Sequence, residues 1–226
     1  MNKTDQMNQM NQINPRPSRR PASLARLYCG APLVEIAPSL CHNQLDMSVS
    51  LWTLGHSTRP IDEFIGLLRA HQISHLVDVR TVPRSRYNPQ FNRDTLAQSL
   101  RDAGLRYRHL AELGGLRKPK KDSLNDGWRN ASFRGYADYM QTDEFLKALE
   151  ELMAESRLQP TAIMCAEAVP WRCHRSLIAD ALVSRDWDIR HIMSPEKATL
   201  HVLTSFAHFE KGVLTYPKPT DPSLLF

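Results

Sequence analysis

The sequence predicts an α/β protein in which strands and helices alternate around a mostly parallel sheet. Short apolar runs typical of buried strands recur along the chain, and each is followed by a segment with apolar residues at helical spacing. Glycine, proline and capping residues lie at the borders of these segments. Because parallel strands need crossover connections, usually helices, we expect a single three-layer domain with five strands, Rossmann-like or flavodoxin-like.

The expected elements follow one another in a regular order. The strands should cover residues 51–55, 75–80, 105–110, 161–165 and 188–193. A helix from residue 61 to 71 has Pro60 in its first turn, and a second helix begins near Asn92, a plausible cap, and stops at Gly104. Thr142 caps a third helix, and residues 173–184 form a fourth. Another short strand or hairpin is expected around His201.

Three regions differ in composition. Residues 1–46 are rich in Asn, Gln, Pro and Arg and lack a sustained period, so we expect them to be mostly disordered. They are either a basic arm or a segment upstream of a true translation start at Met47. Residues 47–200 carry the α/β pattern, and 201–226 form a C-terminal extension. Within the domain, residues 111–141 are irregular: we expect flexibility around 118–126 and then an ordered cover that packs Phe133 and Tyr136.

Composition limits the class of protein. The 226 residues carry a formal net charge of +5, which permits a polyanionic partner without requiring one. No apolar run is long enough for a transmembrane helix, so no membrane partner is expected. Only Cys165 and Cys173 fall in the predicted domain, too few for a disulfide framework. A reduced, cytoplasmic protein is predicted.

Polar and ionisable residues gather where the predicted strands end. All carboxyl ends of parallel strands lie at one edge of the sheet, where open α/β proteins bind ligands. The candidates at this edge are His56, Ser57, Thr58 and Arg59 after the first strand; Asp78, Arg80, Arg86 and Asn92 around the second; and Cys165, Glu167, Arg172, Cys173, His174 and Arg175 after the fourth. Tyr136 is expected to cover them.

Four strings in this chain carry a resemblance to a known family. They are TLGHSTR, LVDVRTVPRSRYNPQFN, FRGYADYM and CAEAVPWRCHRSLIAD. Over residues 51–193 the chain resembles the bacterial and archaeal domain-of-unknown-function family 488 (DUF488). The resemblance implies an intracellular α/β domain whose defining motifs are those at the sheet edge, and it implies no particular reaction.

Three kinds of chemistry are open at this edge. Asp78 and Glu167 could converge as a carboxylate pair for hydrolysis of a glycosidic or N-glycosidic bond. Cys165 or Cys173, beside His174, could act as a nucleophile for sulfur or phosphoryl transfer, although the spacing from Cys165 to Arg172 does not match the phosphatase loop. Both cysteines could equally be buried packing residues.

Zinc is the third chemistry, since Cys165, Cys173 and His174 are suitable ligand types and Glu167 could serve as an acid or base. A later C-x-x-C pair is missing, however, and adjacent Cys173 and His174 should point in different directions on a helix. We therefore expect no metal and no other cofactor.

Arginines outnumber carboxylates at the predicted edge, and the arginine fork suits bidentate contact with phosphate. The sequence therefore predicts an enzyme that acts on a phosphate-bearing substrate, a nucleotide or nucleic acid, by hydrolysis or transfer, with base or glycosidic-bond removal first and thiol-dependent transfer second. A non-enzymatic nucleotide or nucleic-acid binding module is the competing class. In that class, binding would weaken steeply with salt while cysteine and glutamate substitutions leave it unchanged.

Overall fold

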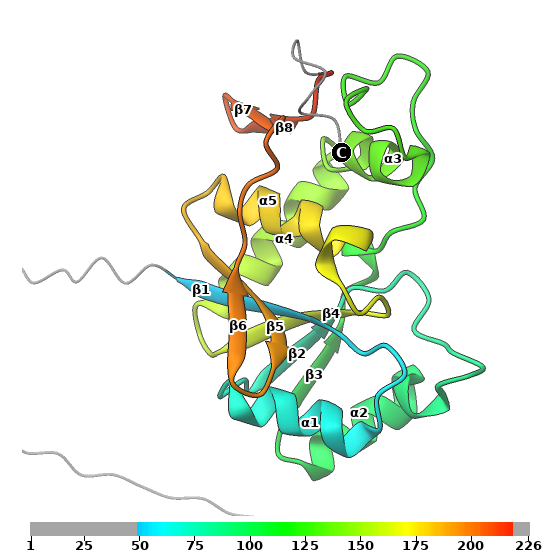
Figure 1. Cartoon of the computed structure of the whole chain (residues 1–226), viewed down its shortest axis with the longest axis vertical. Helices are drawn as coiled ribbons and strands as arrows, with labels where there is room; N and C mark the ends of the chain where they lie inside the picture. Colours follow the sequence, from blue (N-terminus) through cyan, green and yellow to red (C-terminus); the bar gives the residue numbers. More distant parts are fainter. Residues whose placement is uncertain (1–48, 219–226) are drawn as a thin grey trace, which may run out of the picture. The chain divides into compact units, whose positions relative to one another are not determined.

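Six strands form the central sheet of this computed structural model, which describes residues 49–218 (Figure 1). The strands lie in the order β3-β2-β4-β1-β5-β6, and all neighbouring pairs are parallel except β5 and β6. Their bounds are β1 Ser50–Gly55, β2 His75–Asp78, β3 Arg106–His109, β4 Thr161–Cys165, β5 Asp188–Ser194 and β6 Lys197–Leu200. The α/β class and the mostly parallel sheet predicted from the sequence are confirmed.

The described residues contain five α-helices, and all but the third cover the two faces of the sheet (Figure 1). They are α1 Ile61–Ala70, α2 Arg93–Asp102, α3 Ala131–Tyr139, α4 Asp143–Ser156 and α5 Arg175–Val183, and three short 3₁₀ turns lie at Pro89–Phe91, Ala111–Leu113 and Pro170–Arg172. Phe64 of α1 and Leu96 of α2 belong to one buried cluster, whereas Phe145 of α4 and Leu177 of α5 belong to another. Successive residues of β2 and of β4 belong alternately to the two clusters, so helices pack on both sides of the sheet and the domain has three layers.

The sheet differs from the expectation in two respects. It has a sixth strand, β6, which returns antiparallel to β5 across a tight turn and ends next to His201, where a further short strand or hairpin was expected. Its strand order also differs from the Rossmann-like and flavodoxin-like orders, because β1 lies between β4 and β5. Three of the connections, β1 to β2, β3 to β4 and β4 to β5, join strands that have one other strand between them in the sheet. Periodicity reveals the strands but carries no information on which strands become neighbours.

The segment between β3 and α4 is more ordered than its composition indicates. Asn130 caps α3 by accepting a hydrogen bond from the amide of Ser132. Asp138 of that helix is buried and accepts hydrogen bonds from Lys120, Ser123 and Asn125. These three bonds fix the stretch that was expected to be flexible. The expected cover is present as α3, with Tyr136 buried.

The part of the C-terminal extension that the structure describes packs onto the α/β domain. Strands β7 (His208–Glu210) and β8 (Val213–Thr215) pair as a hairpin, and Tyr216 is fully buried with its hydroxyl donating to Asp180 of α5. The predictions for residues 1–46 lie outside the described residues. No helix within residues 49–218 has the combined length and apolar character needed to span a bilayer.

Candidate active site

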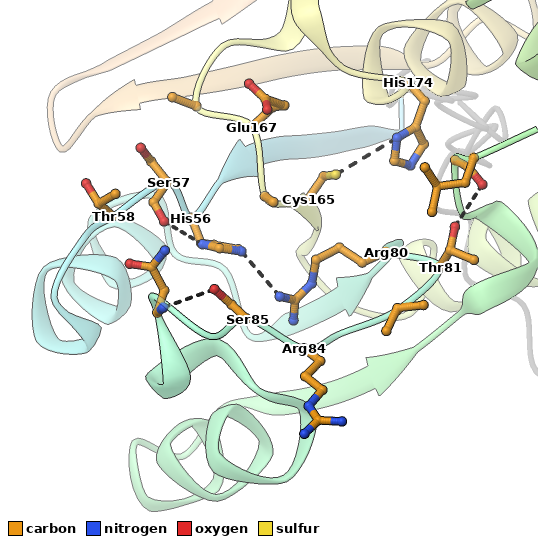
Figure 2. Close-up of a pocket in the computed structure, with 16 residues that line it drawn as sticks. His56, Ser57, Thr58, Arg80, Thr81, Arg84, Ser85, Cys165, Glu167 and His174 are labelled. Carbon is orange, nitrogen blue, oxygen red and sulfur yellow. Dashed lines mark hydrogen bonds between the residues drawn. The ribbon is translucent and has the colours of Figure 1, made fainter. Parts of the chain in front are cut away.

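A pocket of about 550 Å³ opens at the carboxyl end of β4, where the loops after β1, β2 and β4 meet (Figure 2). The helices after β1 and β2 cover one face of the sheet and α5 covers the other, and such a change of side opens a crevice at the strand ends. The pocket is lined by His56, Ser57, Thr58, Arg80, Thr81, Val82, Arg84, Ser85, Asn88, Gly115, Leu116, Cys165, Ala166, Glu167, Ala168 and His174. Its volume suits a small molecule.

The loops after β1 and β4 are in direct backbone contact. The amides of His56 and Ser57 donate to the carbonyl groups of Cys165 and of the residue after it, at 3.0 and 2.9 Å. A Cβ atom on Gly55 would lie 1.7 Å from the carbonyl oxygen of Glu167, so a side chain at this position would push the two loops apart. The glycine therefore fixes one wall of the pocket against the other.

Asp78 forms a buried ion pair with Arg80. The Nε and Nη2 groups of Arg80 donate to the two carboxylate oxygens at 2.8 and 2.6 Å, and the Tyr107 hydroxyl donates to one of them at 2.9 Å. Asp78 is 0% exposed and does not line the pocket. The predicted meeting of Asp78 and Glu167 across the crevice is not formed, because Asp78 faces Arg80 and Tyr107 inside the domain.

His56 is held as a neutral ring at the base of the pocket. Its ring stacks on Phe91 with centroids 4.2 Å apart. Its Nδ1 lies 2.7 Å from the Ser57 carbonyl oxygen and its Nε2 lies 3.2 Å from Nη1 of Arg80. Since a carbonyl only accepts and a guanidinium only donates, Nδ1 carries the proton and Nε2 accepts. Burial lowers the pKa of His56 to about 4, and the Arg80 cation acts in the same direction although the Ser57 carbonyl opposes it.

Two thiols and one imidazole nitrogen converge beside the pocket (Figure 2 shows Cys165 directed at His174). The Sγ atoms of Cys165 and Cys173 lie 3.9 and 3.7 Å from Nδ1 of His174. The Nε2 atom of His174 lies 3.0 Å from the Val79 carbonyl oxygen, so it donates its proton there. Nδ1 is therefore the ring nitrogen that faces both sulfur atoms.

The expectation that Cys173 and His174 point apart is wrong. It assumed that both residues are helical, but Cys173 has extended backbone angles (φ −135°, ψ 144°) at the end of a 3₁₀ turn. His174 is the first residue with helical angles (φ −56°, ψ −14°), and α5 starts at Arg175. The break between the two conformations turns neighbouring side chains toward the same point.

The two thiols differ in their ionisation. A hydrogen bond from the Cys165 thiol, together with His174 and the nearby Arg175 cation, holds the pKa of Cys173 well below its ordinary value. The same hydrogen bond, together with burial, raises the pKa of Cys165. Within the pair, Cys173 is therefore the thiol that ionises more readily.

Arg175 ties the loop after β4 to β1 from inside the domain. It is 1% exposed, and its Nη1 donates to the Thr53 hydroxyl while its Nη2 donates to the Glu167 carbonyl oxygen at 2.6 Å. Its Nε atom is buried with no hydrogen-bond partner, and no described carboxylate forms an ion pair with it. It positions the loop and supplies positive charge to the thiols, and it does not line the pocket.

A chain of hydrogen bonds connects Arg175 to a buried carboxylate. The Thr53 hydroxyl lies 2.8 Å from Nδ1 of His191, Nε2 of His191 lies 2.9 Å from Nδ1 of His201, and Nε2 of His201 lies 2.8 Å from Asp180. Arg175 donates at one end of this chain and Asp180 accepts at the other, an arrangement that is consistent with protons that point toward Asp180 throughout. Burial lowers the pKa of His191 to about 3, which agrees with a neutral ring.

The predicted site residues divide into three groups. Those that line the main pocket are His56, Ser57, Thr58, Arg80, Cys165, Glu167 and His174. Cys173, Arg172 and Tyr136 line a smaller adjoining cavity of about 160 Å³, which also reaches Cys165, Glu167 and His174. Arg59, Asp78, Arg86, Asn92 and Arg175 line neither. The crevice thus contains fewer arginines than the sequence indicated.

Local contacts explain why some of these residues lie elsewhere. Arg59 donates to the Gly55 carbonyl oxygen and to Glu63 on α1. The side chain of Asn92 accepts from the Ser85 amide and so shapes the turn after β2. Arg86 is an exposed side chain of the same turn. Partners supplied by neighbouring turns therefore hold Arg59 and Asn92.

Several pocket residues were missing from the predicted binding set. Thr81, Arg84, Asn88 and Leu116 line the pocket, and the Thr81 hydroxyl donates to the Gly115 carbonyl oxygen. Thr81, Arg84 and Asn88 follow β2 and could have been found by including every polar residue of that loop. Leu116 follows the Gly pair after β3, and apolar character gave no signal for it.

A family model described as "Domain of unknown function DUF488" matches residues 60–182, more than half of the chain. The chain belongs to the DUF488 family. The matched region of this DUF488 protein begins at the turn before α1 and ends within α5, so it contains most of the pocket and the thiol cluster. No curated protein and no solved structure matches the chain.

Proposed function

We propose that this DUF488 domain is an enzyme that transfers a group from an anionic small molecule through the thiol of Cys165. The observation that carries the proposal is the position of Cys165. Its side chain lines the 550 Å³ pocket and also belongs to the cluster with Cys173 and His174. A nucleophile within reach of both a substrate space and a proton acceptor is the arrangement that covalent catalysis requires.

Each neighbour has a distinct role in this proposal. Nδ1 of His174, the ring nitrogen that faces Cys165, accepts the proton that leaves Cys165. Cys173 is the second thiol, and its hydrogen bond with Cys165 makes it the more readily ionised of the two. The backbone contact at Gly55 holds Cys165 against the loop after β1. Together they present an activated sulfur at the base of the pocket.

Sulfane sulfur is the favoured transferred group. The Cys165 thiolate attacks the outer sulfur of a donor ⁻S–X, such as thiosulfate, so that a Cys165 S–S bond forms and Cys165 becomes a persulfide. The donor S–X bond breaks with its electron pair leaving on X, which is sulfite when thiosulfate is the donor. An acceptor nucleophile then takes the terminal sulfur and restores the thiolate. Phosphoryl transfer is less favoured because it needs a cationic clamp on the transferred group, whereas Arg80 is paired with Asp78 and Arg175 is buried behind the loop.

The pocket walls suit an anionic leaving group. Ser57, Thr58, Ser85 and Asn88, whose side chains carry hydroxyl and amide groups, line the pocket. Arg84 also belongs to the lining, and Figure 2 shows it directed away from Cys165, whereas the charge of Arg80 is already paired with Asp78. Glu167 is the one carboxylate in the lining among the described residues. Hydrolysis by a carboxylate pair is therefore less well supported than thiol chemistry.

The test is a sulfurtransferase assay with thiosulfate as donor and cyanide as acceptor, together with mass spectrometry of the protein after donor alone. We expect a gain of one sulfur atom on Cys165 and turnover that Cys165→Ser abolishes. His174→Gln should slow sulfur loading, and Glu167→Gln is the matched control in the same pocket and should retain activity. Full turnover by Cys165→Ser would refute the thiol mechanism. Activity lost only in Glu167→Gln would favour carboxylate chemistry instead.

A further inference from the structure

Cys165, Cys173 and His174 also have the geometry of a soft-metal site. Two Sγ atoms and Nδ1 all lie within 4.8 Å of one another, and the two sulfur-to-nitrogen distances are 3.9 and 3.7 Å. Tetrahedral zinc with ordinary Zn–S and Zn–N bonds places a sulfur and a nitrogen ligand about 3.5 Å apart. The two sulfur-to-nitrogen distances therefore exceed this value by only a few tenths of an ångström.

The ring of His174 has the orientation that is typical of metal-binding histidines. Metal-binding histidines almost always donate their second ring proton to a carbonyl or carboxylate, which fixes the tautomer and the ring plane. Nε2 of His174 donates to the Val79 carbonyl oxygen at 3.0 Å, so Nδ1 is the free nitrogen. A Cβ on Gly115 would lie 3.0 Å from this Nδ1, so the glycine leaves room beside the ring.

Ligand type and burial favour zinc over harder ions. Thiolate and imidazole ligands select zinc and related soft ions, whereas magnesium and calcium prefer carboxylate and carbonyl oxygen. Cys165 and Cys173 are 8% and 3% exposed, and the cluster contacts the main pocket through Cys165 and His174. Three protein ligands with access from one side leave a fourth coordination position for water or a substrate atom.

We infer that Cys165, Cys173 and His174 form a binding site for one zinc ion, with a fourth position open to the pocket. The zinc site itself does not depend on the proposed transfer reaction. One consequence of zinc binding does rest on that reaction: because a sulfur atom bound to zinc is not free to attack a donor, zinc binding and sulfur loading exclude each other at Cys165.

The experiment uses the full chain with Cys29→Ser and Cys41→Ser, because these two cysteines lie outside the described residues and could bind zinc themselves. The protein is reduced with a phosphine, freed of metal, and titrated with Zn²⁺ against a chromophoric chelator. We expect one zinc per chain. Cys173→Ser and His174→Gln should each weaken binding about 100-fold, and Glu167→Gln should leave it unchanged.

Co²⁺ provides a second readout that does not depend on activity. In the same background, cobalt should give the absorption of a tetrahedral thiolate complex, which Cys173→Ser should remove. Thermal melts of each variant without metal check that the fold is retained. Less than half an equivalent of bound zinc, or equal affinity in Cys173→Ser and the parent protein, would overturn the site.

The two proposals fail in different ways. If zinc binds but thiosulfate never loads sulfur onto the zinc-free protein, the metal site stands and the transfer function fails. If sulfur loads and zinc does not bind, the reverse holds. If both occur, adding one equivalent of Zn²⁺ before the donor should block sulfur loading, and unchanged loading would refute the mutual exclusion.

Discussion

Replacing His56 by Gln should remove a defined part of the acid sensitivity of this fold. In the folded protein the pKa of His56 is lowered to about 4 from 6.5, chiefly because burial disfavours the charged ring. The neutral ring is then favoured in the folded state. Gln keeps an acceptor for Arg80 and cannot titrate in this range.

The direction in which stability changes with pH follows from how many protons the folded and unfolded states bind. Between pH 6.5 and 4 the unfolded chain binds more protons at His56 than the folded protein, so stability falls as pH falls. The neutral His56 ring contributes its full share of stability at pH values above the pKa of this histidine in the unfolded chain. That contribution is largely lost once the pH falls to the pKa of His56 in the folded protein. At pH 4.5 the loss relative to pH 7.5 is about 2.5 kcal/mol for these two pKa values.

The assay is urea unfolding at intervals from pH 7.5 to 4.5. Wild type and His56→Gln share the titration of His191 and of the carboxylates, so the difference between their pH profiles isolates His56. His208→Gln, at an exposed position on β7, is the matched control and should follow the wild-type profile. If His56→Gln loses as much stability as wild type over this range, the inferred neutral, buried ring is incorrect.

Four further substitutions, of which Gly66→Ala is a control, test the framework of the site. Gly55→Ala should destabilise the fold by about 1 to 3 kcal/mol in urea unfolding, because its Cβ meets the loop after β4, whereas Gly66→Ala has open space in α1 and should stabilise by about 0.5 to 1 kcal/mol. Asp78→Asn leaves the Arg80 charge buried and unpaired and should cost about 3 to 5 kcal/mol; a cost under 1 kcal/mol would contradict the ion pair. Asp180→Asn weakens the end of the hydrogen-bonded chain from Arg175 and should cost about 1 to 3 kcal/mol, with slower sulfur loading of Cys165; unchanged stability would argue against that chain.

The sequence predicted the parts of the site that depend on local pattern. Apolar runs and helical spacing placed β4, α4 and the polar loops correctly, since burial imposes these periods on any α/β chain. From parallel strands it follows that the loops after β1, β2 and β4 share one edge, and the pocket lies there. The sequence alone therefore predicted that Cys165, Glu167 and His174 lie near one another at this edge of the sheet.

Side-chain partners could not be predicted in the same way. Asp78 looked free to enter the crevice, yet it is bound to Arg80 and Tyr107, the second of which comes from β3. Arg175 looked like a substrate clamp, yet it is buried against Thr53 and the loop after β4. Which partner a polar group finds depends on strand order, and the position of β1 between β4 and β5 is a property of the whole fold.

The sequence by itself determined the α/β class, the edge of the sheet at which the polar loops meet, and the kinds of side chain available there, because periodicity and residue type are local properties. Only the tertiary structure decided which groups meet. It buried Asp78 in an ion pair, joined Arg175 to Asp180 through two histidines, and turned Cys173 and His174 toward Cys165. Contacts between residues far apart in sequence, and one change of backbone conformation at the start of α5, fixed those outcomes.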